Sequence, residues 1–452
     1  MLFSHRAILA STAALAIATG CGIAPAPRLN VILLMADDLG WGDVGWNGHP
    51  TLRTPELDDL AANGVRFDRF YSAPTCSQTR ASVLTGRNSR RFGIDDANVG
   101  VLRHSEVTLA ELLRDAGYTT GIFGKWHLGA MTADEQDAHR GGNPAFYSPP
   151  WEHGFDVSFA TEARVPTFDP LVDNADDRIG ASAYWAGPGR RVPDGPEVRG
   201  DDSRIVMDQM LRFIRRSTTE GRPFLAVAWF HAPHVPVRAD PDDDTYAGVP
   251  LKPRAYYTVV TALDRQIGRL RDELRAQGLA RNTLVVFSSD NGPRQGPGRT
   301  AGLKGGKDSL FEGGIRVPAA LEWPTAIPPR VITTPASTDD LLPTILDLAG
   351  VPLPTDLALD GESLRAIVFG ERSARSRPIG IEIGEQRAWI DGPLKLIRHR
   401  HGDPFELYDV EADPRERKNL TRARPTRVAE MRAELDAWRR SVDRDRRTLG
   451  TR

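Results

Sequence analysis

Short apolar runs recur along the chain, and most of them end in a group of polar residues. Four such stretches are "LNVILLMADDLG", "YTTGIFGKWHLG", "PFLAVAWFHAPHVP" and "NTLVVFSSDNGP". Their length and flanking turn residues predict buried parallel strands, because a strand covered on both faces carries a nearly continuous apolar sequence. Stretches such as "TPELDDLAANG" and "VTLAELLRDAG" lie between them and predict helices, with a threonine before each start and a glycine at each stop.

Strands that alternate with helices indicate an α/β fold with a large, mostly parallel sheet flanked by helices. Polar residues follow the strands directly, and ligands bind at that edge of an open α/β sheet. We therefore expect the polar groups to converge in space. The segment from about residue 131 to 200 has little periodicity and many Pro, Gly and Asp residues, which indicates long surface loops over the site.

The pattern changes beyond about residue 370. Short alternating runs separated by turn residues predict a smaller antiparallel sheet, and "RPTRVAEMRAELDAWRRSV" predicts a helix after it. One face of that helix carries Val428, Met431, Leu435 and Trp438, which is typical of core packing. The expected organisation is an export segment at 1–28, a catalytic domain at 29–370 and a C-terminal subdomain at 371–452.

The first residues, "MLFSHRAILASTAALAIATGCG", carry one arginine and then a run of apolar and small residues. This run is too short and too rich in alanine for a membrane span, and it indicates a removable export signal. "AIATGC" also resembles a bacterial lipoprotein signal, in which Cys21 would be lipidated, although plain secretion remains the alternative. We expect an exported protein, in the periplasm or on the outer membrane, whose membrane contact is limited to a lipid anchor at Cys21.

Composition narrows the class of protein. The chain is 40% hydrophobic and 26% charged, with a formal net charge of -2, which is ordinary for a soluble globular protein and argues against non-specific nucleic-acid binding. It has 2 cysteines. If Cys21 is lipidated or removed, Cys76 has no partner for an intramolecular disulfide.

Two acidic pairs suggest a metal site. Asp37 and Asp38 follow the first apolar run, and Asp290 and Asn291 follow a later one. Three carboxylates and an amide oxygen suit Ca²⁺, or Mg²⁺, better than a softer metal. Either pair alone is more typical of a turn. Because both follow predicted strands, we favour a metal site.

A second group of residues suggests a pocket for a compact, multiply oxygenated anion. Cys76 stands at the predicted start of a short helix, where free N–H groups and the helix dipole favour anions. Taken singly, the lysines of this group are typical of solvated residues and the histidines of structural ones. The cationic and proton-carrying candidates are Arg80, Lys125, His127, His234 and Lys307.

From about residue 29 to 420 the chain resembles the type I sulfatases, which are relatives of alkaline phosphatase. The motifs that carry this resemblance stand in the family's order: "ADDLGWGD", "CSQTRASVLTGR", "GYTTGIFGKWHLG", "HAPHVP", "SSDNGP", "GGKDSLFEGGIRVP" and "ELYDVEADPRERKNL". The resemblance implies that a maturation enzyme oxidises Cys76 to formylglycine. In this family, one oxygen of the hydrated aldehyde attacks sulfur and the other later helps to expel sulfate.

The resemblance also implies a role for each candidate residue. Arg80 would orient the diol, and Lys125 and Lys307 would contact sulfate oxygens. His234 would protonate the leaving alcohol and His127 would take a proton as sulfate leaves; the motif spacing favours these residues over the nearby Lys304 and His231. The calcium ligands would be Asp37, Asp38, Asp290, Asn291 and the modified residue 76.

One residue departs from the family pattern Cys-x-Pro-x-Arg, or Cys-x-Ala-x-Arg: Gln78 occupies the middle position. A maturation enzyme that tolerates this change, an unmodified thiol, and a non-catalytic lipoprotein that binds sulfated glycans are all compatible with the sequence. A hydrolase of phosphodiesters or phosphonate monoesters is a further alternative on the same scaffold. Because the metal and sulfate residues are intact, we expect a sulfatase that acts on a sulfated carbohydrate or an aryl sulfate.

Overall fold

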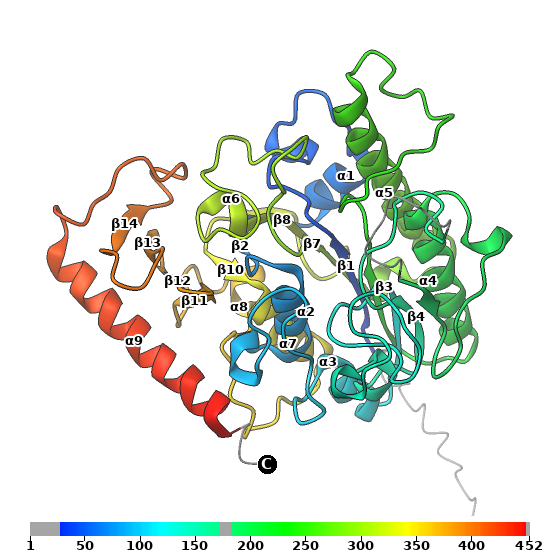
Figure 1. The fold of residues 1–452 in the computed structure, drawn as a ribbon, viewed down its shortest axis with the longest axis horizontal. Coiled ribbons are helices and arrows are strands. Elements are labelled where there is room, and N and C mark those ends of the chain that lie inside the picture. The colour runs from blue at the N-terminus through cyan, green and yellow to red at the C-terminus, as the bar shows by residue number, and fades with distance from the viewer. Residues whose placement is uncertain (1–27, 172–181, 449–452) are drawn as a thin grey trace, which may run out of the picture.

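The computed structural model describes residues 28–171 and 182–448 (Figure 1). Most of the described strands form one ten-stranded sheet. These strands are β1 (Asn30–Ala36), β2 (Val65–Tyr71), β3 (Thr119–Lys125), β4 (Val157–Thr161), β5 (Tyr184–Trp185), β6 (Phe224–Trp229), β7 (Thr283–Ser289), β8 (Arg316–Glu322), β9 (Arg330–Ile332) and β10 (Ala336–Ser337).

The strand order is β10-β2-β8-β7-β1-β6-β3-β4-β5, with β9 paired to β2. The central strands β7, β1, β6, β3 and β4 are all parallel to their neighbours in this set. Antiparallel pairs occur on β8, with β2 and β7, and between β4 and β5. The predicted mostly parallel sheet is therefore confirmed.

Helices cover both faces of this sheet, as Figure 1 shows. Side chains alternate along β1, so that Val31 and Leu33 enter one core and Ile32 and Leu34 enter the other. The first core also receives α2 (Cys76–Thr85), α3 (Leu109–Asp115), α7 (Leu341–Ala349) and α8 (Arg365–Val368). The second receives α1 (Pro55–Asn63), α4 (Asp202–Thr219) and α5 (Leu251–Ala276).

The predicted helix boundaries match local chemistry. At the start of α3, the Thr108 side chain accepts from the Glu111 N–H, and the Glu111 side chain accepts from the Thr108 N–H, which is the predicted capping box. Helix α2 ends at Gly86, whose φ of 66° lies in the left-handed region that glycine adopts without strain. The described short 3-10 turns are η1 (Gly45–Asn47), η2 (Ser89–Phe92), η3 (Pro144–Phe146), η4 (Pro150–Glu152), η5 (Pro196–Val198), η6 (Ala280–Asn282) and η7 (Thr338–Asp340).

A second, antiparallel sheet follows near the C-terminus, at the left of Figure 1. Its strands are β11 (Ile379–Ile383), β12 (Gln386–Asp391), β13 (Leu394–Arg398) and β14 (Glu406–Asp409). Met431 and Leu435 of α9 (Pro425–Thr448) pack on one face of it, beside Val428 and Trp438. The other face packs against Tyr71, Leu310 and Ile315, the last of these in α6 (Glu312–Ile315). The predicted sheet and helix are confirmed, while the boundary at 370 stays a prediction.

The interpretation of 131–200 as surface loops is wrong in part. Strand β4 lies within the main sheet beside β3, and β5 adds a short strand at its edge. The five residues of β4, "VSFAT", include three small or hydroxyl side chains, so the run lacks the apolar signal of the longer strands. The predicted export segment and Cys21 lie outside the described residues. None of the described helices is long and apolar enough to cross a membrane.

Candidate active site

The carboxyl ends of β7, β1 and β3 bring the polar motifs together. Asp37 follows β1, Asp290 follows β7, and Lys125 is the last residue of β3. Backbone bonds fix these ends: the Asp37 N–H donates to Ala232 O at 3.0 Å, and the Asp290 N–H donates to Ala36 O at 3.1 Å. The convergence expected of polar groups that follow parallel strands is therefore present.

Three carboxylates are buried side by side at this edge: Asp37, Asp38 and Asp290. Asp38 has a φ of 63°, and its N–H donates to Asp290 Oδ1 at 3.0 Å. Burial alone would raise the pKa of Asp37, but Lys125, His234 and Arg80 hold it well below its usual value. Burial and the neighbouring charge of Asp37 raise the pKa of Asp290 to about 7. Without a bound cation, Asp37 is therefore ionised at neutral pH, whereas Asp290 is partly protonated.

Two oxygens of this cluster fit a cation. Asp37 Oδ1 and Asn291 Oδ1 are buried and have no hydrogen-bond partner among the described residues. An unpaired buried oxygen is costly, and a hard cation would satisfy both of them. One set of ligand atoms within 4.8 Å of one another comes from Asp37, Cys76 and Asp290. The residues present therefore fit the Ca²⁺ or Mg²⁺ predicted from the sequence.

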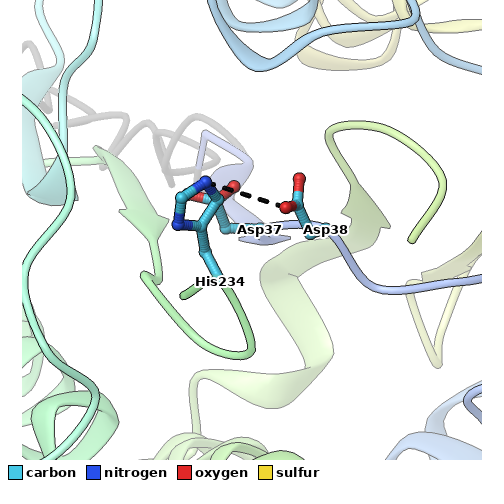
Figure 2. A group of neighbouring side chains, drawn as sticks. All are labelled: Asp37, Asp38 and His234. Carbon is cyan, nitrogen blue, oxygen red and sulfur yellow. Dashed lines mark ion pairs between the residues drawn. The ribbon is translucent and has the colours of Figure 1, made fainter. Parts of the chain in front are cut away.

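His234 forms a second group of closely spaced ligand atoms with Asp37 and Asp38. Figure 2 shows its ring beside Asp37 and Asp38, with Nε2 3.7 Å from Asp38 Oδ2. The other ring nitrogen, Nδ1, lies 2.6 Å from the Val235 carbonyl oxygen and donates to it. Burial lowers the pKa of His234 to about 4. The ring is therefore neutral at pH 7 in the absence of substrate, with its lone pair at Nε2.

Cys76 is the first residue of α2 and is 1% exposed. Its Sγ lies 3.5 Å from Lys307 Nζ. Burial raises the pKa of the thiol, although Lys125 and Lys307 act in the opposite direction. A thiolate nucleophile requires the reverse shift, so the environment does not favour catalysis by the thiol itself.

Each of the three carboxylates has a buried cationic partner. Lys125 Nζ lies 2.6 Å from Asp37 Oδ2, and Lys307 Nζ bonds Asp38 Oδ1. Arg80 NH2 lies 2.7 Å from Asp290 Oδ2 and 3.3 Å from Asp37 Oδ2. Within this group, the positive and negative charges are therefore matched pair by pair.

The two residues rejected on motif spacing lie in other surroundings. His231 is fully buried between Asp202 Oδ2 and Thr161 Oγ1, each at 2.8 Å. Lys304 places its ammonium over the Phe311 ring, 3.7 Å from the centroid. Both residues are engaged in other contacts, and the assignment of His234 and Lys307 stays a prediction.

Gln78 connects this site to the C-terminal sheet. Its side chain is 2% exposed, and its amide donates to Asp95 O at 3.0 Å and to Glu382 O, in β11, at 3.2 Å. Its Oε1 accepts from the Thr75 hydroxyl at 3.2 Å. Proline or alanine at this position would make none of these bonds. The departure from the family pattern therefore has a structural role.

The sequence did not point to three further residues at the site. Asn98 Oδ1 lies 2.9 Å from His127 Nε2, and Ser77 Oγ donates to the His127 carbonyl oxygen at 2.8 Å. Arg294 lies at the rim, with its side chain 53% exposed and Nε 3.6 Å from Asp38 Oδ2. Asn98 stands in "DDANVG", a typical turn sequence with no apolar run before it. The hydrophobic pattern therefore did not mark Asn98 as a site residue.

Comparisons with known proteins agree on one family. The family model described as Sulfatase matches residues 29–351. The dog N-acetylgalactosamine-6-sulfatase is 36% identical over 80% of this chain and 70% of its own length. The mouse steryl-sulfatase is 31% identical over 92% of this chain and 82% of its own length. The crystal structure of Ps i-CgsB in complex with k-i-k-neocarrahexaose is 27% identical, with a TM-score of 0.79 over 91% of this chain and 92% of that one.

Proposed function

The chain belongs to the sulfatase family and is a sulfate ester hydrolase, and on this premise we propose that it desulfates sulfated carbohydrates by means of a formylglycine at residue 76 and a bound Ca²⁺. Two of the similar proteins support the choice of carbohydrate: one is by name a sulfatase of N-acetylgalactosamine, and the other was solved with a hexaose. An aryl sulfate would serve as an artificial substrate for the same chemistry.

The observation that carries this proposal is a pair of buried oxygens without a hydrogen-bond partner among the described residues, Asp37 Oδ1 and Asn291 Oδ1. With Asp38, Asp290 and residue 76, they form an oxygen-rich ligand set. Such a set suits Ca²⁺, with Mg²⁺ as the second choice. A bound cation would polarise a sulfate oxygen and help to neutralise the charge of the transition state.

The modification of residue 76 is supported by the surroundings of the thiol. The pKa of the buried Cys76 thiol is raised rather than lowered. Formylglycine would supply a hydrated aldehyde as the nucleophile, which needs no thiolate. A formylglycine-generating enzyme is then a required partner, and it would act on the unfolded chain because residue 76 is 1% exposed in the fold.

The buried cations would hold residue 76 and the sulfate group. Arg80 lies one helical turn after Cys76 and is fixed by Asp290 and by the Lys125 carbonyl oxygen; it would orient the nucleophile. Lys125 and Lys307 would donate to sulfate oxygens. Because both ammonium groups are buried, their attraction for the developing charge is stronger than it would be in water.

Two histidines would move the protons. His234 donates Nδ1–H to Val235 O, so Nε2 is the atom that would carry a proton to the leaving alcohol. Its pKa of about 4 in the free protein would rise when an anion binds beside it, because a negative charge stabilises the imidazolium. His127 would accept the proton that is released as sulfate leaves residue 76.

Sulfate release from a panel of sulfated oligosaccharides tests the function. The enzyme, matured with a formylglycine-generating enzyme, is expected to release sulfate from at least one member. The Cys76→Ala variant should release none, with an unchanged circular dichroism spectrum. Activity on aryl sulfates alone would contradict the carbohydrate assignment, and hydrolysis by Cys76→Ala would contradict the role of residue 76. We also propose export to the periplasm or outer membrane, with lipidation at Cys21 to be tested by the mass of the mature N-terminus.

A further inference from the structure

The turn that holds Asn98 contacts the proposed catalytic machinery through the Asn98 carboxamide. Asn98 Oδ1 lies 2.9 Å from His127 Nε2. Asn98 has a φ of 61°, a left-handed conformation that asparagine tolerates better than most residues. Its backbone N–H faces Ser77 Oγ at 3.4 Å. The carboxamide is therefore held at the edge of the imidazole by its own backbone geometry.

The backbone of His127 is fixed independently of Asn98. Its N–H donates to Glu162 O at 2.9 Å, and its carbonyl oxygen accepts from Ser77 Oγ at 2.8 Å. His127 itself has a φ of 59°. These bonds fix where the side chain begins, but they do not decide which ring nitrogen carries the proton.

The carboxamide oxygen of Asn98 decides which ring nitrogen of His127 carries the proton. A neutral imidazole carries one N–H and one lone pair, and the hydrogen bond made by one nitrogen sets the role of the other. A carbonyl oxygen only accepts, so Nε2 must be the N–H of His127. Nδ1 is buried without a hydrogen-bond partner in the described part of the chain, which leaves it as the basic atom.

We propose that Asn98 is a positioning residue that holds His127 in the Nε2–H tautomer and so makes Nδ1 the proton acceptor. This inference rests on the proposed function, in which His127 takes the proton released with sulfate. Asn98 transfers no proton and contacts the reaction only through His127. With the carboxamide removed, the imidazole is free to place its proton on Nδ1, and that tautomer cannot accept there.

Two substitutions isolate the carboxamide without straining the turn. Asn98→Gly removes the side chain, and glycine accepts a φ of 61° at no cost. Asn98→Asp keeps an acceptor at the same place and also tolerates this backbone. Val99→Ala, on the same turn, removes the two γ-methyl groups of a residue that is 49% exposed and serves as the matched control.

The kinetic test uses the matured enzyme and an aryl sulfate. Asn98→Gly is expected to lower kcat by roughly tenfold to hundredfold with little change in KM, as for other residues that orient a functional imidazole. It should add nothing to the loss caused by His127→Ala, because residues that act as one unit are not additive. An unchanged kcat, or an equal loss on the His127→Ala background, would overturn the proposal.

Asn98→Asp should retain most of kcat and move the acidic limb of its pH profile to higher pH, because a carboxylate stabilises the protonated ring. In the wild-type protein, burial is the main cause that lowers the pKa of His127. The positive charges of Lys125, Arg140 and Arg80 lower it further, while Asp37 acts in the opposite direction. A loss in this variant as large as in Asn98→Gly would count against the tautomer argument.

The tautomer can also be read without any activity. In the ¹⁵N spectrum of histidine-labelled protein, Nε2 of His127 should have the shift of a protonated nitrogen and Nδ1 that of an unprotonated one. The reverse assignment in the wild-type protein would overturn the proposal even if the variants were slow. Full activity in His127→Ala would instead contradict the proposed role of His127, which separates the two failures.

Discussion

Arg80 and Asp290 form an ion pair with no exposed side-chain surface, with NH2 2.7 Å from Oδ2. The guanidinium of Arg80 also lies over the Trp229 ring, 5.2 Å from its centroid. Arg80 comes from α2, which begins at Cys76, whereas Asp290 follows β7 in the centre of the sheet. This pair therefore fixes the helix that carries residue 76 against the carboxylates.

Loss of this arginine should destabilise the fold. Arg80→Met leaves Asp290 and Asp37 buried without their shared partner, and breaking a buried pair costs about 3–5 kcal/mol. Chemical denaturation in EDTA measures this loss. Arg216→Met, which breaks the exposed pair with Glu220, is the control and should change stability very little, because solvent screens an exposed ion pair. Equal losses in the two variants would contradict the structural role of Arg80.

Removal of one carboxylate should remove the cation. Asp290→Asn keeps the shape of the side chain but loses a negative charge, so calcium should bind much more weakly and activity should fall with it. Isothermal titration of metal-free protein with Ca²⁺ measures the binding. Asp272→Asn, at a side chain that is 78% exposed, should bind Ca²⁺ as the wild type does. Unchanged affinity in Asp290→Asn would remove Asp290 from the proposed ligand set.

Gln78 should matter more for stability than for turnover. Gln78→Ala leaves the carbonyl oxygens of Asp95 and Glu382 without this donor, and an unmade buried hydrogen bond costs about 1–3 kcal/mol. Its kcat, expressed per formylglycine measured by mass spectrometry, should stay close to the wild-type value, because the bonds of Gln78 go to backbone oxygens and to Thr75. A large loss of kcat on this basis, with stability unchanged, would reverse the assignment.

Asp339 should make stability depend on pH. Burial and the charges of Asp360 and Asp340 raise its pKa to about 8, so between about pH 4 and 8 the folded state holds a proton that the unfolded state releases. Rising pH then disfavours folding, by at most about 1.4 kcal/mol per pH unit. Asp339→Asn lacks this proton. The free energy of unfolding of the variant, relative to that of the wild type, should therefore increase from pH 5 to pH 8.

Thermal or denaturant unfolding of both proteins at the two pH values measures this difference. Titrating groups that do not interact with Asp339 behave alike in both proteins and cancel in the comparison. A difference that does not change with pH would show that the carboxyl of Asp339 titrates near its ordinary pKa in the fold.

The sequence predicted those parts of the site that follow strands. Asp37, Lys125 and Asp290 come after apolar runs, and the carboxyl ends of parallel strands share one edge of a sheet, so their convergence was predictable. Asn98 lies on a turn whose position depends on tertiary contacts with Ser77 and His127, and no periodicity marks it.

The contact between Gln78 and β11 was also beyond prediction from the sequence, because the two lie 304 positions apart. Strand β4 was missed for a different reason: its five residues have too weak an apolar pattern to separate them from the surrounding loops. For Gln78, the missing information was which segments pack together.

The mass of the peptide that contains residue 76 tests the central claim most directly. The protein should be produced in a host that contains a formylglycine-generating enzyme and then digested and analysed by mass spectrometry. Replacement of CH₂SH by CHO lowers the mass by about 18 Da, a change that lies outside the ordinary oxidation products of a thiol. This loss would show that Gln78 is tolerated and that residue 76 is the proposed nucleophile. An intact thiol in protein that releases sulfate would contradict the account.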